Sequence, residues 1–100
     1  MILARVVGTV VSSHKPEKLN GIKFLLLEKI DPITLKGKND FVISMDTVGA
    51  GIHEIVFYVS GSSAKYTSVT GGGLPSDSAI TGIVDFIEKD GLYTYEKYKA

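Results

Sequence analysis

The sequence predicts an all-β fold: a small closed β-barrel of about five strands with short helical turns and a C-terminal hairpin or tail. Runs rich in Val, Ile and Thr recur at close spacing along the 100 residues, and clusters of turn-forming residues separate them. The first run contains Gly8, and a glycine inside a strand is typical of a bulge or a barrel corner. Five or six short strands in one small chain favour a closed barrel of the OB type over a sandwich.

The first half of the chain supplies three expected strands. The first spans Ile2–Ser12 and the second spans Ile22–Ile30, and a polar loop lies between them. Asp31-Pro32 ends the second strand, since such a dipeptide initiates a turn. Another polar loop, Thr34–Asp40, leads to a third strand at Phe41–Met45.

The second half begins with a fourth strand at Glu54–Val59 and a short helical turn through Ala64, Lys65 and Tyr66, which Ser62 or Ser63 caps. The remaining elements, in order, are a glycine-rich segment at Thr67–Ser78, a fifth strand at Ala79–Glu88, a two-residue turn at Asp90-Gly91, and a return strand or extended tail at Leu92–Tyr98.

Size and composition predict one soluble domain, residues 1–100, with no nucleic-acid or membrane partner. The formal net charge is zero, so the chain lacks the excess of positive charge that would attract nucleic acid or anionic lipid. The absence of cysteine excludes disulfides and thiolate metal sites. The apolar start Met1–Gly8 lacks the basic region and cleavage site of a signal peptide. No apolar run approaches the roughly 20 residues of a membrane span, so we expect a cytoplasmic protein.

Two strands are apolar on both faces. A strand with one solvent-exposed face alternates between apolar and polar residues. Phe24–Leu27 and Ile55–Val59 do not alternate in this way. A small barrel buries only one face of each strand, and this chain has almost no helix to cover the other. A partner chain is the favoured cover, and long loops are the alternative.

Gly49-Ala50-Gly51 resembles the start of a dinucleotide-binding G-x-G-x-x-G motif, but Glu54 stands where the third glycine belongs. The motif also needs a helix after it, whereas a strand pattern follows here. The favoured interpretation is a tight connection between strands, where glycine supplies a positive φ or a close backbone approach.

Gly61-Ser62-Ser63-Ala64 resembles the start of a nucleophile elbow, but Lys65 replaces its last glycine and no α/β sheet is expected. A Ser-His-Asp set with Asp46 and either histidine stays open, because triads assemble in space. Nothing else in the sequence supports that set, so capping by serine is favoured and no catalytic residue is assigned.

Metal, cofactor and base-stacking sites are not predicted either. His14 and His53 are not at metal-ligand spacing, and no cysteine joins them. The five tyrosines could form a stacking platform for single-stranded nucleic acid, but no basic groove accompanies them. Tyr93, Tyr95 and Tyr98 cluster near the C-terminus, where an amphipathic strand or interface tail is favoured.

Three segments in register resemble the EutN/CcmL family of bacterial microcompartment vertex proteins. They are LARVVGTVVSSHKPEKLNGIKFLLLEKID, MDTVGAGIHEIVFYVSGSSAK and PSDSAITGIVDFI, within a match from Met1 to about Ile87. Two positions depart from the family pattern. His53 stands where the family usually has glycine, and Lys65 stands where it usually has arginine, which keeps the charge but loses the bidentate fork.

The resemblance implies an OB-like barrel that assembles into a cyclic homopentamer and serves as a shell component without catalysis or cofactors. Its partners would be copies of itself and the hexameric proteins of the shell facets. A ring joins two different surfaces of each subunit, which agrees with the doubly apolar strands. The residues expected at a subunit contact or at the axial opening are Asp46, Thr47, Val48, Gly49, Ala50, Gly51, Gly61, Ser62, Ser63 and Lys65. The alternatives are an OB-type nucleic-acid-binding module and a small enzyme that uses the 46–65 segment.

Overall fold

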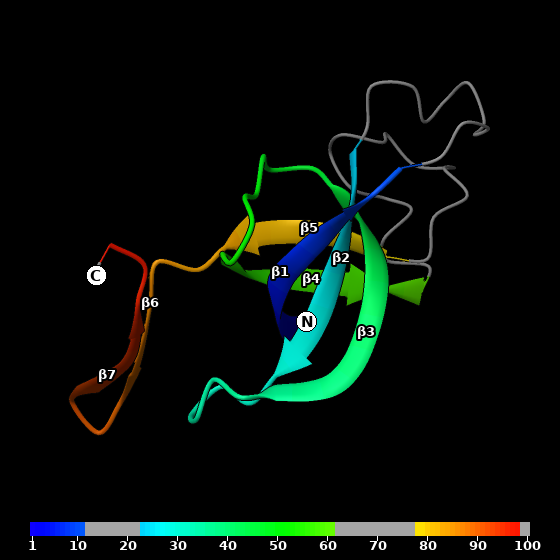
Figure 1. Ribbon diagram of the computed structural model, residues 1–100. Coiled ribbons are helices and arrows are strands. Elements are labelled where there is room, and N and C mark those ends of the chain that lie inside the picture. The colour runs from blue at the N-terminus through cyan, green and yellow to red at the C-terminus, as the bar shows by residue number, and fades with distance from the viewer. Residues whose placement is uncertain (12–22, 62–77, 99–100) are drawn as a thin grey trace.

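The computed structural model describes residues 1–11, 23–61 and 78–98 and contains a closed barrel and a separate hairpin (Figure 1). The barrel strands are β1 (Ile2–Val10), β2 (Lys23–Ile30), β3 (Gly37–Asp46), β4 (Ile55–Ser60) and β5 (Ser78–Ile83). They close in the order β1-β2-β3-β5-β4, and every pair is antiparallel except β3 with β5. The predicted all-β closed barrel is confirmed.

Gly8 lies at an irregularity of β1, as predicted. The pairing of β1 with β2 changes register between Val6 and Gly8, so that Val6 faces Leu27 and Gly8 faces Leu26. A bulge of this kind bends the strand and increases its twist. One edge of β1 pairs with β2 from Ala4 to Val10, and the other edge pairs with β4 from Ile2 to Arg5.

Alternate strand residues fill the barrel, because successive side chains of a strand point to opposite faces. On β2, Leu25 and Leu27 are buried, whereas Phe24 and Leu26 remain partly exposed on the outer face. The main core cluster consists of Ala4, Val6, Leu25, Leu27, Ala50, Val56, Tyr58 and Ile80. The doubly apolar strands therefore fill the interior with one face and leave apolar side chains outside with the other.

Strand β3 begins at Gly37, four residues before the predicted start at Phe41. The segment predicted as a polar loop pairs with β2 instead: Ile30 faces Gly37, and the backbone N–H of Asn39 donates to Glu28 Oε2 at 3.1 Å. Lys38, Asn39 and Asp40 are all exposed. An extension with both faces in water needs no apolar alternation, so its sequence resembles a loop.

The predicted fifth strand, Ala79–Glu88, is two strands in the structure. Its first part is β5 in the barrel, and its second part is β6 (Phe86–Lys89), which pairs with β7 (Leu92–Glu96) in the hairpin. Both residues of the connecting turn have a positive φ, 53° at Asp90 and 79° at Gly91. These are the signs of a type I′ turn, and they confirm the predicted hairpin.

One face of the hairpin packs against the barrel. Ile87 and Tyr95 contact a buried cluster of Ile30, Ile55 and Val84, and the backbone N–H of Lys97 donates to the Asp85 carbonyl at 2.8 Å. The described ranges contain no helix, and so none that is long and apolar enough to cross a membrane. The predicted helical turn at residues 64–66 and its caps lie outside the described residues.

Candidate functional site: the β3–β4 loop

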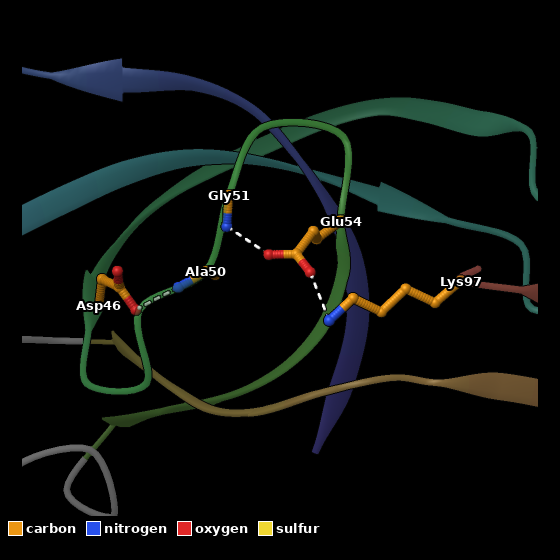
Figure 2. A network of polar contacts seen from close by, with 5 residues as sticks. All are labelled: Asp46, Ala50, Gly51, Glu54 and Lys97. Atoms are coloured by element: carbon orange, nitrogen blue, oxygen red, sulfur yellow. Dashed lines mark hydrogen bonds and ion pairs between the residues drawn. The ribbon is translucent and has the colours of Figure 1, made fainter.

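The loop between β3 and β4 is ordered by the side chain at its start. Asp46 Oδ1 accepts hydrogen bonds from the backbone N–H groups of Val48, Gly49 and Ala50 at 3.1, 2.9 and 3.2 Å. Figure 2 shows the bond to Ala50. One carboxylate oxygen thus gathers three consecutive amides, as in an Asx turn. Because one oxygen of the Asp46 carboxylate already accepts three backbone hydrogen bonds, a structural role for Asp46 is favoured over a role as the acid of a catalytic triad.

The two glycines of the loop meet different demands, and both were predicted. Gly49 has a φ of 76°, and an added Cβ would meet no atom within 4 Å, so only the backbone conformation restricts this position. At Gly51 an added Cβ would lie 3.2 Å from Glu54 Oε1, which is a close approach. The strand β4 follows this segment, so the helix that a dinucleotide-binding motif requires is absent from it.

A second turn closes the loop at Gly51–Glu54, where the Glu54 N–H donates to the Gly51 carbonyl at 3.2 Å. His53, the third residue, has a φ of 72°, which is the conformation that a type II turn prefers to fill with glycine. The family usually has glycine at this position, and glycine adopts this positive φ without strain.

Contacts with the barrel fix the loop at both ends. The His53 N–H donates to the Val6 carbonyl at 2.8 Å, and the Val6 N–H donates to the Glu54 carbonyl at 2.9 Å. The Thr47 hydroxyl donates to the Ile80 carbonyl, and Ala50 is buried in the main core cluster. The loop is therefore a packed part of the barrel end.

Glu54 also connects the loop to the hairpin. Its Oε1 accepts from the Gly51 N–H at 2.5 Å, and its Oε2 lies 2.8 Å from Lys97 Nζ (Figure 2). The Lys97 ammonium, together with the Gly51 amide, holds the pKa of the Glu54 carboxyl below its ordinary value. The same pair raises the pKa of Lys97. The sequence analysis missed this pair, because no local pattern joins residues so far apart in the chain.

The loop nevertheless presents apolar side chains to solvent. Val48 is 39 % exposed and Ile52 is 47 % exposed. Gly61, with a φ of 70°, directly follows β4. Ser62, Ser63, Lys65 and His14 lie outside the described residues. A loop whose two carboxylates accept from its own backbone and whose apolar side chains are exposed is suited to contact another protein.

Comparisons with known proteins agree with the barrel fold. A family profile described as "Ethanolamine utilisation protein EutN/carboxysome" matches residues 1–85. The carboxysome shell vertex protein CcmL of Thermosynechococcus vestitus is 38% identical over 99 residues, which cover 97% of this chain and 96% of that protein. The structure of CcmL from Gloeobacter violaceus superimposes with a TM-score of 0.89 at 36% identity, covering 99% of this chain and 100% of the other.

A shorter relative is also similar. GrpN from Rhodospirillum rubrum, whose structure is described as a pentameric microcompartment shell protein, superimposes with a TM-score of 0.75 at 39% identity. The match covers 98% of GrpN but 89% of this chain. This similarity therefore includes almost the whole of a smaller protein.

Proposed function

The chain belongs to the EutN/CcmL family, and from this premise we propose that it is a structural shell protein that forms cyclic pentamers at the vertices of a bacterial microcompartment. The observation that carries the proposal is similarity along the whole chain to proteins described as shell vertex proteins, with the barrel superimposing at a TM-score of 0.89. A relative described as pentameric supports the fivefold assembly.

The geometry of a closed shell gives this function its physical meaning. Hexameric units tile a flat sheet, and fivefold units introduce the curvature that closes it. The proposed partners are therefore other copies of this chain and hexameric facet proteins, in a shell within the bacterial cytoplasm. A ring of five needs two different surfaces on each subunit, one for each neighbour.

The proposed role is structural and includes no catalytic step or cofactor. The hydrogen bonds of Asp46 and Glu54 support this, because both carboxylates accept from backbone amides of their own loop. We propose that the loop segments at residues 46–51 and 61–65 lie at a subunit contact or at the axial opening of the ring. The exposed side chain of Val48 is consistent with such a contact.

Native mass spectrometry of the purified chain tests the assembly. We expect a species of five subunits of 10.8 kDa each. A monomer that persists across micromolar concentrations would contradict the proposal, and a stable hexamer would count against it. Co-expression with a hexameric facet protein then tests the vertex role, since closed polyhedra should require this chain.

A further inference from the structure

The outer face of the barrel has an apolar surface on β2 and β3, which we call the outer ridge and define as Leu26, Phe41 and Ile43. Ile43 lies opposite Leu26 in the sheet, and Phe41 lies two residues along β3 on the same face. Phe41 is 50 % exposed and Ile43 is 53 % exposed. Neighbouring exposed side chains of this size form a continuous apolar surface, which is typical of a protein contact.

A second apolar surface lies on β1 and β4 and is concave. We call it the side groove; it is lined by Met1, Leu3 and Phe57 on the barrel side and by Pro32, Val84, Phe86 and Ile87 on the other. Leu3 and Phe57 face each other across the β1–β4 pair. The groove has a volume of about 320 Å³.

The two surfaces lie on separate pairs of strands. The barrel closes in the order β1-β2-β3-β5-β4 (Figure 1). The outer ridge lies on β2 and β3, and the barrel side of the side groove lies on β4 and β1. A contact between identical surfaces would cover one of them and leave the other in water. A contact of ridge to groove covers both in every subunit and is heterologous, as a ring requires.

The barrel is the part of the chain that the family profile matches. The family match ends at residue 85, immediately before β6. GrpN is described as pentameric, although almost its whole length is accounted for by a match to 89% of this chain. The outer ridge lies wholly within the matched residues, whereas the side groove combines residues inside the match with Phe86 and Ile87 of β6.

We propose that the outer ridge of one subunit, through Phe41 and Ile43, seats in the side groove of the next subunit around the ring. This inference rests on the proposed pentamer and adds the two surfaces that form its interface. The occupant of the groove is thus a second copy of this chain. Burial of both surfaces releases water from apolar walls, which is the main driving force of protein association.

Cysteine cross-linking tests the contact cleanly, because the natural chain has no cysteine. We expect the double variant Leu3→Cys/Ile43→Cys, treated with a short bismaleimide, to give a ladder of covalent oligomers that ends at five subunits on a denaturing gel. The matched control is Ile43→Cys/Leu92→Cys. Leu92 is 73 % exposed at the hairpin turn, outside both surfaces, and this pair should give no ladder.

The outcomes separate this inference from the proposed function. A pentamer by native mass spectrometry without a ladder from Leu3→Cys/Ile43→Cys would overturn the interface and leave the vertex function standing. A cross-linked dimer from Ile43→Cys alone would also overturn it, since that product needs ridge to meet ridge. A wild-type chain that is monomeric would instead overturn the proposed function itself.

A charge placed on the ridge gives an independent test. Ile43→Lys should reduce the pentamer at least tenfold at a fixed micromolar concentration and leave folded monomers with unchanged far-UV circular dichroism. Leu92→Lys, the matched control, should assemble like the natural chain. A folded Ile43→Lys variant that is fully pentameric would contradict the contact, and if the variant fails to fold, the cross-linking experiment decides.

Discussion

Glu54 and Lys97 pair at 2.8 Å and connect the β3–β4 loop to the C-terminal hairpin. Their side chains are only 20 % and 22 % exposed, so the pair is shielded from much of the solvent. The second oxygen of Glu54 holds the Gly51 amide at 2.5 Å. One carboxylate therefore orders the loop and docks the hairpin, and loss of its charge should affect both.

The first prediction concerns the pH dependence of stability. The pKa of Glu54 in the folded chain lies below the ordinary 4.5. Its stabilisation is therefore complete above that ordinary value and is lost as the pH falls through the lower folded pKa. The free energy of unfolding should be larger for the natural chain than for Glu54→Gln at neutral pH, and the difference should shrink on acidification. Urea unfolding at several pH values measures it.

A control separates Glu54 from Asp31, whose pKa is also lowered, by hydrogen bonds from the backbone N–H groups of Thr34 and Ile33. Asp31 is unchanged in Glu54→Gln, so its titration cancels in the difference. Lys97→Ala should remove part of the same pH dependence, because it removes the ion pair but leaves the Gly51 hydrogen bond. A difference independent of pH would show that the carboxylate charge contributes nothing.

The second prediction concerns Gly49. A side chain at a φ of 76° is strained, while the space around an added Cβ is empty. Gly49→Ala should therefore lower the free energy of unfolding by about 1–2 kcal/mol through the backbone conformation alone. Thermal or urea unfolding measures the change. Gly8→Ala, with no positive φ and only ordinary contacts at Leu26, is the comparison, and an equal cost there would remove the conformational explanation.

The third prediction reverses this substitution at His53. Its φ of 72° costs energy for any residue with a Cβ, although histidine tolerates it better than branched residues. His53→Gly should raise the free energy of unfolding by up to about 1 kcal/mol, since the relief of strain exceeds the entropy that glycine adds to the unfolded chain. Clear destabilisation by His53→Gly would mean that the imidazole makes a contact more valuable than the strain.

The fourth prediction concerns assembly. Gly51→Val should lower the pentamer yield and leave shells open on co-expression with a facet protein. The reason is the contact with Glu54 Oε1, 3.2 Å from an added Cβ, rather than a positive φ. Lys36→Ala and Lys38→Ala should form normal shells, because solvated charges contribute little. Electron microscopy distinguishes the cases, and closed polyhedra with Gly51→Val would place the critical contact in another loop.

The sequence alone determined the features that depend on local chemistry. Runs rich in Val, Ile and Thr between turn-forming residues predicted most of the strand positions, and Gly8 predicted the bulge. Asp90-Gly91 predicted the hairpin turn, because few residue pairs accept two consecutive positive φ values. The three motifs in register indicated the family, which the profile match over residues 1–85 confirmed. Each of these signals lies within a few neighbouring residues or in their order.

Only the tertiary structure decided the rest. The early start of β3 at Gly37 depends on its pairing with β2, and the break between β5 and β6 depends on a change of partner from β4 to β7. The Glu54–Lys97 pair depends on the packing of the hairpin against the barrel, and the separation of the outer ridge from the side groove depends on strand order. The residue order within one strand shows that both of its faces are apolar, but it does not show which strands become its neighbours. Barrel closure sets those neighbours, since it brings residues distant in the chain within bonding distance.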